Sequence, residues 1–427
     1  MNATREVVRA SALHGSLRVP GDKSASHRAL MLSALASGPS TIEGLSPGRD
    51  VESTSAIIVQ LGAERLNEND LVTLVGPEQG LKRSERDLDC GNSGTTMRLM
   101  AGVVSGVLGS HTLVGDSSLS KRPMDRVATP LNLMGATVKG QGDRNTAPLQ
   151  VEGSRALRGI DYVVPVVSAQ VKSAILLAAL GAAGPTSVHE DVLTRTTTED
   201  MFRLAGLSVH SLEEKGGGTV TVNPGRPRAT KWRIPGDPSQ AAYFAVLGAI
   251  HDCAVLEVLN VDSSPQRIGF VTVLQRMGAA VTMEPRDGGV SLLSQSSELV
   301  GAEINSSEIP SVDEVPILAV AAAAATGVSV FRDMAELRVK ESDRFSGSIA
   351  LAKSLGCRVW EEGDDFFVEG LGSARSFSTF ALHASLDHRM VMAAAVAGCA
   401  GGGCTISGSD TVSSSYPNFF NDLASLS

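Results

Sequence analysis

Hydrophobic and polar positions along the chain fall into two recurring patterns. The first is a polar segment, then an Ala/Leu-rich stretch that is apolar on nearly all sides, then a break of small residues and a β-rich run. A helix that is apolar all round is expected inside a protein core. The second pattern has one apolar face, ends near a glycine and leads into a strand. It predicts an amphipathic helix that covers the core.

The first pattern occurs six times at intervals of about 70 residues, a fixed period of the kind that signals repeated supersecondary units. The six copies start at Pro20, Cys90, Val166, Pro235, Val312 and Leu386. The second pattern follows five of them, at 59–66, 132–140, 203–211, 275–283 and 353–361. Only 416–427 remains for the sixth copy. We therefore expect the extra N-terminal stretch to supply its missing strands.

Each repeat is thus predicted to run strand–helix–strand–helix–strand–strand. Six repeats predict an α/β protein of two similar domains with three repeats each. Two Pro-Gly-Asp motifs, 20–22 and 235–237, suit a double crossover of the chain between domains. We expect 21–235 to form the N-terminal domain, and 1–20 together with 236–427 to form the C-terminal domain.

Composition limits the possible functions. A hydrophobic content of 42% and a charged content of 19% are typical of soluble globular proteins. The formal net charge of −9 argues against nucleic acid as the main partner, because such binding depends on neutralising phosphates. Five scattered cysteines favour a reducing cytosol and give no metal site. We expect no signal peptide and no membrane span, since the apolar runs are Ala-rich and short.

The stretch 336–344, ELRVKESDR, holds three cations and three anions. If it enters a helix, Lys340, Glu341 and Arg344 lie three and four apart and share a face. That face would suit a doubly anionic ligand and a proton transfer. The alternative is a solvated, salt-bridged helix start, the usual fate of mixed charge runs. A further acid pair, Asp313 and Glu314, precedes this stretch.

Polar side chains open the buried helices and act there as predicted caps: Ser24 and Ser26, Ser93 and Thr95, and Ser168. Helix N-termini favour anions, so a cleft faced by several of them would bind an anion even in an acidic protein. Cations stand near these segments. Some have the alternative of a solvated loop or cap: Lys23, Arg28, Lys121, Arg122 and Arg126. Lys172 belongs with Ser168 and Gln170 to a polar group that forms either a cap or a ligand shelf before a buried helix. Arg195 and Arg389 are further cations of this kind. His388 has the alternative of a satisfied core residue.

Seven motifs together resemble the 5-enolpyruvylshikimate-3-phosphate (EPSP) synthase family, in the same order and over essentially the full chain. They are PGDKSASHRA, CGNSGTTMR, KRPMDR, SAQVKSA, DEVPILAVAAA, ELRVKESDR and LDHRM. The resemblance implies the enolpyruvyl transferase fold, an inside-out α/β barrel in two domains with a ligand cleft between them. It implies transfer of the enolpyruvyl group of phosphoenolpyruvate to the 5-hydroxyl of shikimate 3-phosphate, with release of phosphate, in chorismate and aromatic amino-acid biosynthesis. It also implies a cytoplasmic monomer that needs no metal or organic cofactor.

The resemblance also assigns roles to individual residues. Shikimate 3-phosphate would be bound by Lys23, Ser24, Arg28, Ser168, Ala169, Gln170, Arg195, Asp313 and Lys340. Phosphoenolpyruvate would be bound by Lys23, Asn92, Gly94, Arg122, Gln170, Arg344, His388 and Arg389. Asp313 would accept the proton of the attacking hydroxyl, and Glu341 would exchange a proton with the methylene carbon, with Lys23 assisting. Two phosphates and two carboxylates need several desolvated cations, and addition followed by elimination needs two carboxylates.

Four positions depart from the family pattern or bear on its inhibition. Ser414 stands where some members have a lysine that contacts phosphoenolpyruvate, and Thr194 precedes Arg195 where a serine is expected. Gly94 implies inhibition by glyphosate. Leu99, where some members have proline, leaves the degree of sensitivity open.

Two alternatives remain. The sister enolpyruvyl transferase that acts on UDP-N-acetylglucosamine typically carries a loop cysteine, which LSKRPMDR lacks. The other alternative is a homologue that binds anions but has lost activity. A missing carboxylate or arginine at the site would support this second alternative. The carboxylates and arginines that the resemblance requires are all present: Asp313, Glu341, Arg122, Arg344 and Arg389.

Overall fold

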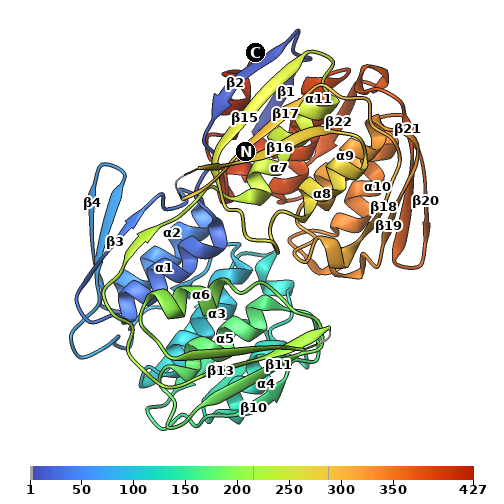
Figure 1. The fold of residues 1–427 in the computed structure, drawn as a ribbon. Helices are drawn as coiled ribbons and strands as arrows, with labels where there is room; N and C mark the ends of the chain where they lie inside the picture. Colours follow the sequence, from blue (N-terminus) through green and yellow to red (C-terminus); the bar gives the residue numbers. More distant parts are fainter. Residues whose placement is uncertain (1–2, 215, 287) are drawn as a thin grey trace. The chain divides into compact units, whose positions relative to one another are not determined.

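The computed structural model describes residues 3–214, 216–286 and 288–427. The chain divides into two compact units. One is the continuous segment Lys23–Ile234, which we call the inserted unit. The other, the split unit, joins Met1–Asp22 to Pro235–Ser427. In Figure 1 the inserted unit runs from blue to green, and the split unit combines the dark blue N-terminal strands with the yellow-to-red part.

The inserted unit contains three four-stranded sheets of one design, in which an edge strand runs parallel to its neighbour and a hairpin pairs antiparallel on the other side. The first sheet consists of β14 (Lys231–Arg233), β3 (Pro39–Glu43), β5 (Leu71–Val75) and β4 (Glu64–Glu68). The second consists of β6 (Leu88–Asp89), β7 (Gly109–Val114), β9 (Thr146–Gly153) and β8 (Thr137–Gln141). The third consists of β10 (Asp161–Val163), β11 (Thr186–Glu190), β13 (Gly217–Val222) and β12 (Val209–Glu214).

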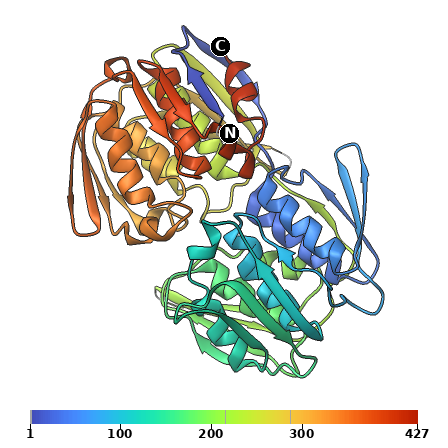
Figure 2. The same cartoon turned by 180° about the vertical axis from the view of Figure 1, so that it is seen from behind.

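The split unit repeats this design in two four-stranded sheets, and its third sheet has three strands. Its first sheet consists of β2 (Leu13–Leu17), β15 (Ala254–Val261), β17 (Gly289–Gln295) and β16 (Ala280–Arg286). The second consists of β18 (Glu303–Asn305), β19 (Thr326–Arg332), β21 (Asp365–Leu371) and β20 (Arg358–Glu362). The third consists of β22 (Phe380–His383), β23 (Cys404–Ser407) and β1 (Thr4–Val7). Because β1 pairs antiparallel with β23, the two ends of the chain share a sheet, as Figure 2 shows from behind.

Two kinds of helix follow the two sequence patterns. The helices of the first pattern are largely buried: α1 (Lys23–Leu35), α3 (Gly94–Ser105), α5 (Ala169–Ala179), α7 (Pro238–Ile250), α9 (Val315–Ala324) and α11 (His388–Ala400). The others keep an exposed side: α2 (Arg49–Gln60), α4 (Asp125–Leu133), α6 (Thr197–Leu204), α8 (Gly269–Arg276), α10 (Arg344–Ser354) and α12 (Phe419–Ala424). Short 3-10 helices are η1 (Leu119–Lys121), η2 (Ser306–Glu308), η3 (Ala335–Val339), η4 (Ala374–Ser376) and η5 (Ser409–Ser414).

Two strands are exchanged between repeats. Strand β2 precedes α1 in the sequence, but it pairs parallel with β15, which follows α7. Strand β14 precedes α7, but it pairs parallel with β3, which follows α1. Each unit therefore completes one sheet with a strand that a simple reading of the repeat would give to the other unit. Each unit also has its own hydrophobic core.

The helix starts agree with the sequence prediction in part. Ser93 and Ser168 cap α3 and α5, because their side chains accept hydrogen bonds from backbone N–H groups of the first turn. The prediction was wrong for Thr95, which lies inside α3. It was also wrong for Ser24 and Ser26. Both lie inside α1, and the Ser26 hydroxyl accepts a bond from the N–H of Ser46 at 3.0 Å.

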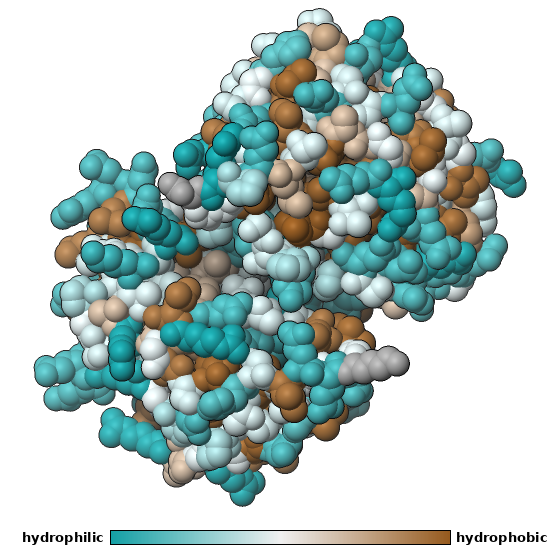
Figure 3. Space-filling view, in the orientation of Figure 1, coloured by the Kyte–Doolittle hydropathy of each residue, from teal (hydrophilic) through white to brown (hydrophobic). Residues whose placement is uncertain are grey.

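Hydrophilic side chains cover most of the face of each unit that Figure 3 shows, and hydrophobic ones lie among them in small groups. This agrees with the burial of the Ala/Leu-rich helices in two cores, since apolar side chains leave water when a helix packs on its sheet. In the part of the chain that the structure describes, no helix is both long and apolar enough to cross a membrane.

Candidate active site

The split unit gathers one group of predicted site residues around Arg344, the first residue of α10. Its Nη1 atom lies 2.9 Å from Asp313 Oδ1, and its Nη2 atom lies 2.6 Å from Glu341 Oε2. Arg389, in the first turn of α11, places Nη2 3.2 Å from the other oxygen of Asp313. Asp313 is thus held between two arginines, which come from helices far apart in the sequence.

The charges in this cluster set the ionisation of Asp313. Burial alone would raise the pKa of its carboxyl. Three nearby cations, Arg389 first and then Lys340 and Arg344, lower the pKa by more, so it lies well below its ordinary value. The carboxylate is therefore ionised at neutral pH. The two arginines that hold it would bind an anionic ligand as well, because guanidinium groups match carboxylate and phosphate geometry.

The backbone next to these carboxylates is strained. Val312 has φ of 49° and Leu386 has φ of 62°, in the left-handed region that branched side chains rarely adopt. These residues directly precede Asp313 and Asp387 in the sequence. Such conformations persist only where the surroundings fix them, and they concentrate at functional sites.

The stretch 336–344 does not form one helical face. The side chain of Asp343 accepts a bond from Ser346 N–H and caps α10, so the helix begins only at Arg344. Lys340 and Glu341 precede the helix, after η3 has ended. Glu341 still reaches Arg344, while Lys340 lies 3.9 Å from Glu336. The predicted grouping of these charges therefore arises from a turn and not from helical spacing. His388 is buried at the start of α11.

The inserted unit gathers a second group around Arg28, which is buried in α1. Its Nε atom donates to Thr198 Oγ1 and its Nη2 atom to Ser173 Oγ, both at 2.6 Å. Its Nη1 atom donates to the backbone oxygen of Ser24 at 2.9 Å. The Arg195 side chain lies 3.5 Å from the Ser24 hydroxyl. The starts of α1, α5 and α6 therefore converge on one cationic side chain.

A third group lies at the start of α3. Gln170, in the first turn of α5, accepts a bond from Arg98 Nη1 at 2.7 Å and donates to Thr95 Oγ1 at 2.9 Å. Ala169, the first residue of α5, adds no polar side chain. A methyl group at Gly94 would lie 2.8 Å from Arg98 Nη1 and 3.2 Å from Arg122 Nη1. A side chain here would force the ends of these two arginine side chains to shift, and glycine leaves them in place.

Acidic and amide groups orient the remaining cations of the inserted unit. Arg122 Nη2 donates to Asn92 Oδ1 at 2.5 Å, and the amide of Asn92 donates to Asp116 at 2.6 Å. Lys23 forms an ion pair with the buried Asp50. Asp50 and Asp116 could not be found from the sequence, because each meets its partner only through the tertiary fold and no local motif marks it.

Lys172 is not part of a ligand shelf. Its Nζ atom lies 2.7 Å from both Glu190 Oε2 and Glu199 Oε1, and the exposed fraction of its side chain is 1%. This side chain belongs to the core of the inserted unit. Sequence analysis left this position open between a helix cap and a ligand shelf. It is neither, because helical spacing turns Lys172 away from the start of α5.

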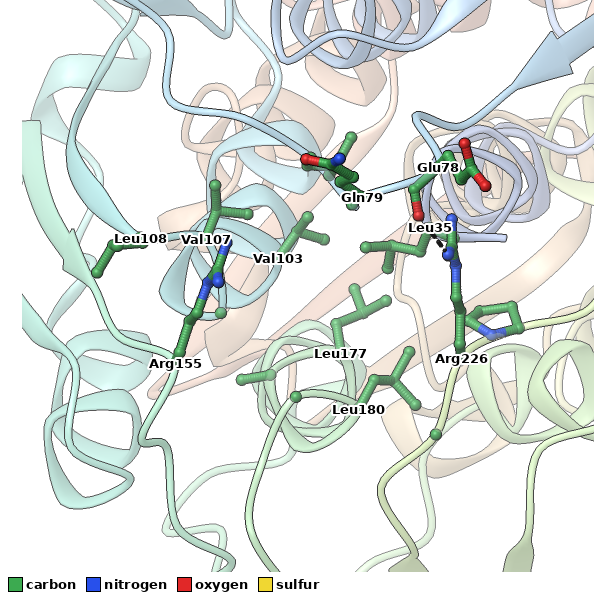
Figure 4. A pocket seen from close by; sticks show the side chains of 17 residues that line it. Leu35, Glu78, Gln79, Val103, Val107, Leu108, Arg155, Leu177, Leu180 and Arg226 are labelled. Carbon is green, nitrogen blue, oxygen red and sulfur yellow. Dashed lines mark hydrogen bonds between the residues drawn. The ribbon is translucent and has the colours of Figure 1, made fainter. Parts of the chain in front are cut away.

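A cavity of about 540 Å³ lies at the other end of the buried helices of the inserted unit (Figure 4). Leu35, Val103 and Leu177, near the C-terminal ends of α1, α3 and α5, contribute to its lining. On one side, Arg226 donates hydrogen bonds to the backbone oxygens of Leu35 and Glu78. None of the predicted site residues lines this cavity.

Among the described residues, no group of three or more His, Cys, Asp or Glu side chains is arranged to hold a metal ion. The three groups of site residues combine arginines and lysines with carboxylates, amides and hydroxyls.

The same fold occurs in known structures. The enolpyruvyl transferase NikO from Streptomyces tendae matches with a TM-score of 0.77 at 18% identity, over 99% of this chain and 96% of that chain. An EPSP synthase from Acinetobacter baumannii matches with a TM-score of 0.86 at 36% identity, over 100% of this chain and 98% of that chain. The chain therefore has the enolpyruvyl transferase fold, as predicted.

The model of the EPSP synthase (3-phosphoshikimate 1-carboxyvinyltransferase) family matches residues 7–423. A 3-phosphoshikimate 1-carboxyvinyltransferase from Synechococcus sp. is 43% identical, over 99% of this chain and 98% of the relative. One from Bacillus cereus is 40% identical, over 97% of each chain. The chain belongs to the EPSP synthase family, which confirms the resemblance found in the sequence.

Proposed function

We propose that this chain transfers the enolpyruvyl group of phosphoenolpyruvate to the 5-hydroxyl of shikimate 3-phosphate and releases phosphate. The observation that carries the proposal is Asp313, held between Arg344 and Arg389 in a chain that matches the family over 7–423. A carboxylate between two guanidinium groups supplies a base beside a site for an anion, and this reaction needs both.

The phosphate of shikimate 3-phosphate would lie against the inserted unit. Arg28 Nη1 donates to the backbone oxygen of Ser24, and Arg195 Nη1 lies 3.5 Å from the Ser24 hydroxyl. The N-termini of α1 and α5 add backbone N–H groups, which favour an anion. Ser168, Ala169 and Gln170 at the start of α5 would complete this subsite.

The family resemblance assigns a second set of residues to phosphoenolpyruvate. Gly94 leaves room beside Arg122 in the inserted unit, where Lys23, Asn92 and Gln170 would also contribute. In the split unit, the resemblance assigns Arg344, His388 and Arg389 to this ligand. Arginine suits this role because it binds carboxylate and phosphate through two N–H groups at once.

Ligand binding would also change the pKa of Asp313, the proposed base. With no ligand bound, the arginines keep the pKa of Asp313 low, which makes the carboxylate a weak base. An anion that binds Arg344 and Arg389 offsets their charge, and the pKa of Asp313 then rises toward a useful range. Asp313 would take the hydroxyl proton while Lys340 contacts the ring hydroxyls. Glu341 and Lys23 would exchange the proton at the methylene carbon.

Phosphate release tests the proposal. Purified protein is mixed with phosphoenolpyruvate and either shikimate 3-phosphate or UDP-N-acetylglucosamine. We expect release only with shikimate 3-phosphate, and a fall of at least about a hundredfold in kcat for Asp313→Asn. Asp364→Asn, an exposed carboxylate in the same unit, is the matched control. Release only with the sugar nucleotide would assign the sister reaction. Release with neither would favour an inactive anion-binding homologue.

Three finer points belong to the same proposal. Glyphosate should compete with phosphoenolpyruvate, and an assay at concentrations well above that of phosphoenolpyruvate decides this. The protein should be a cytoplasmic monomer, with a molar mass by light scattering close to 44.3 kDa. Phosphoenolpyruvate binding should also proceed without a lysine at Ser414, which lies in η5.

A further inference from the structure

One buried arginine joins the two Pro-Gly-Asp motifs. Arg267 lies in the segment between β15 and α8, and the exposed fraction of its side chain is 4%. Its Nη1 atom lies 2.6 Å from Asp22 Oδ2, and its Nη2 atom lies 2.7 Å from Asp237 Oδ1. Both aspartates are buried as well. The two motifs lie far apart in the sequence, and this guanidinium group holds them together.

The backbone reinforces this junction. The N–H of Asp22 donates to the Pro235 oxygen at 2.7 Å, and the N–H of Asp237 donates to the Pro20 oxygen at 2.9 Å. A methyl group at Gly236 would lie 2.9 Å from a Val19 methyl carbon, so the close approach requires glycine. The chain leaves the split unit after Asp22 and returns at Pro235. Arg267 therefore ties the two crossings of the chain to each other.

The junction continues toward the candidate active site through two side chains. Asp237 caps α7 by accepting a bond from Ser239 N–H at 2.9 Å, and Arg267 Nη2 lies 3.3 Å from the Ser239 hydroxyl. That hydroxyl donates in turn to the Glu314 carboxylate. Glu314 is buried and directly follows Asp313 in the sequence. The Ser239 hydroxyl therefore connects Arg267 to the residue next to Asp313.

Glu314 organises the loop that carries Asp313. Its second oxygen accepts a bond from the Ser311 hydroxyl at 2.8 Å, and this hydroxyl accepts a bond from the N–H of Asp313 at 3.3 Å. Val312 lies between these residues with φ of 49°. A branched residue in this conformation needs its surroundings to hold it. The contacts that hold the loop lead back to Ser239 and Arg267.

The charges explain why an arginine occupies this place. Burial alone would lower the pKa of Arg267, but Asp22, Asp237 and Glu314 raise it above its ordinary value. A guanidinium group can contact both aspartates and the serine at the same time, because its donors form a planar fork. A lysine carries the same charge at a single point.

We infer that Arg267 is a positioning residue for the proposed transfer. It fixes the two chain crossings to each other and, through Ser239 and Glu314, holds the Ser311–Glu314 loop so that Asp313 faces its arginines. The inference rests on the proposed function in one respect only, namely that the orientation of Asp313 matters for turnover. The hold of Arg267 on the loop can be tested without any activity.

Two substitutions test the connection at different points. Arg267→Lys keeps the positive charge but loses the planar guanidinium group that contacts both aspartates and the serine. Ser239→Ala leaves both ion pairs of Arg267 intact and removes the hydroxyl that lies between Arg267 and Glu314. It therefore tests the link even if the lysine variant folds poorly. The matched control is Arg276→Lys, because Arg276 also bonds one carboxylate through two nitrogens, at 2.6 and 3.0 Å from Glu308, but on the surface.

Two readouts are taken on the full chain. Amide hydrogen exchange of 309–316 should become faster by about tenfold in Arg267→Lys and Ser239→Ala and stay unchanged in Arg276→Lys. In steady-state kinetics, kcat should fall between about tenfold and a hundredfold in the first two variants, the usual effect of a misplaced catalytic group. KM for shikimate 3-phosphate should change by less than about threefold, since its phosphate would bind the inserted unit.

The outcomes separate the inference from the proposed function. Unchanged exchange in both variants overturns the inference, as does faster exchange with unchanged kcat. An equal fall of kcat in Arg276→Lys also overturns it, because the effect would then not be specific to Arg267. A wild-type protein without turnover would overturn the proposed function instead. The exchange measurement would then still decide whether Arg267 holds the loop.

Discussion

Arg344 and Asp387 form a fully buried, two-pronged ion pair. Arg344 Nε lies 2.8 Å from Asp387 Oδ2, and Arg344 Nη2 lies 3.2 Å from Oδ1. The exposed fraction of each side chain is 0%. The protein therefore sets the plane of the guanidinium group before any ligand arrives, and the Nη1 atom is left facing Asp313. A ligand would meet an arginine that has already lost its conformational freedom.

We predict that Arg344→Lys lowers kcat/KM for phosphoenolpyruvate by about a hundredfold or more, because a lysine cannot contact Asp387, Glu341 and a ligand at once. Steady-state kinetics with varied phosphoenolpyruvate measure the effect. Arg358→Lys, at an exposed strand position, is the control and should behave like the wild type. A kcat/KM within about threefold of the wild type would contradict a role for the Arg344 fork.

We predict that Asp387→Asn lowers the free energy of unfolding by about 3–5 kcal/mol, because the change removes the fully buried one of the three carboxylates that pair with the Arg344 guanidinium group. Thermal unfolding at pH 7 measures the loss. Glu369→Gln removes an exposed carboxylate from the same unit and is the control, with an expected melting temperature close to that of the wild type. If Asp387→Asn lowers the melting temperature no more than this control does, the buried pair is not a main stabilising contact.

The same pair predicts a pH dependence. Burial alone would raise the pKa of Asp387, but Arg344 and His388 lower it by more, so the folded-state pKa lies below the ordinary value of 3.8. As the pH falls below about 4, the unfolded chain takes up this proton first, and the stabilising contribution is lost. We therefore expect the difference in melting temperature between wild type and Asp387→Asn to be full at about pH 5 to 7 and to narrow toward about pH 3. A constant difference would contradict the lowered pKa.

We predict that Gly94→Ala raises KM for phosphoenolpyruvate by about tenfold or more with little change in KM for shikimate 3-phosphate. The added methyl group would push Arg98 and Arg122 out of position, and interactions with a doubly charged group depend strongly on geometry. Steady-state kinetics with each substrate varied in turn measure this. Gly184→Ala is the matched change, because a methyl group there meets nothing within 4 Å, and it should leave both KM values unaltered.

We predict that Lys172→Met destabilises the inserted unit by about 3–5 kcal/mol, since Glu190 and Glu199 would remain buried with their cation removed. Calorimetry should show a lower unfolding temperature. Lys139→Met, at an exposed position of the same unit, should leave it unchanged. Adding Glu190→Gln to Lys172→Met should recover part of the loss. Failure of the double variant to recover any stability would argue that packing, and not charge, explains the effect.

The repeat fold could be read from the sequence because its signals are local. Ala-rich stretches such as 315–324 are apolar on every side, and their spacing repeats along the chain. The exchange of β2 and β14 could not be read in the same way. The two strands are short, at Leu13–Leu17 and Lys231–Arg233. Neither contains a residue pattern that predicts which of two similar sheets the strand will join.

The candidate site could be predicted as a set of residues but not as a set of contacts. Arg344 was found through its motif, yet its partners come from three separate stretches of the chain. Arg267 was missed because its segment carries no motif, and its role appears only when Asp22 and Asp237 come together. Lys172 was predicted near the site because its neighbours in the sequence are polar. Helical geometry places its side chain in the core instead.

The pairing of β1 with β23 has a consequence for the order in which the protein can be made. A ribosome releases β1 and β2 early, but the partner of β1 at 404–407 and the partner of β2 at 254–258 emerge much later. At typical synthesis rates the wait for β23 is on the order of half a minute or more. The inserted unit is one continuous segment, so it can fold during that time. Strand β1 cannot form its native pairing until β23 exists, and until then its backbone N–H and C=O groups lack the partners that the sheet provides.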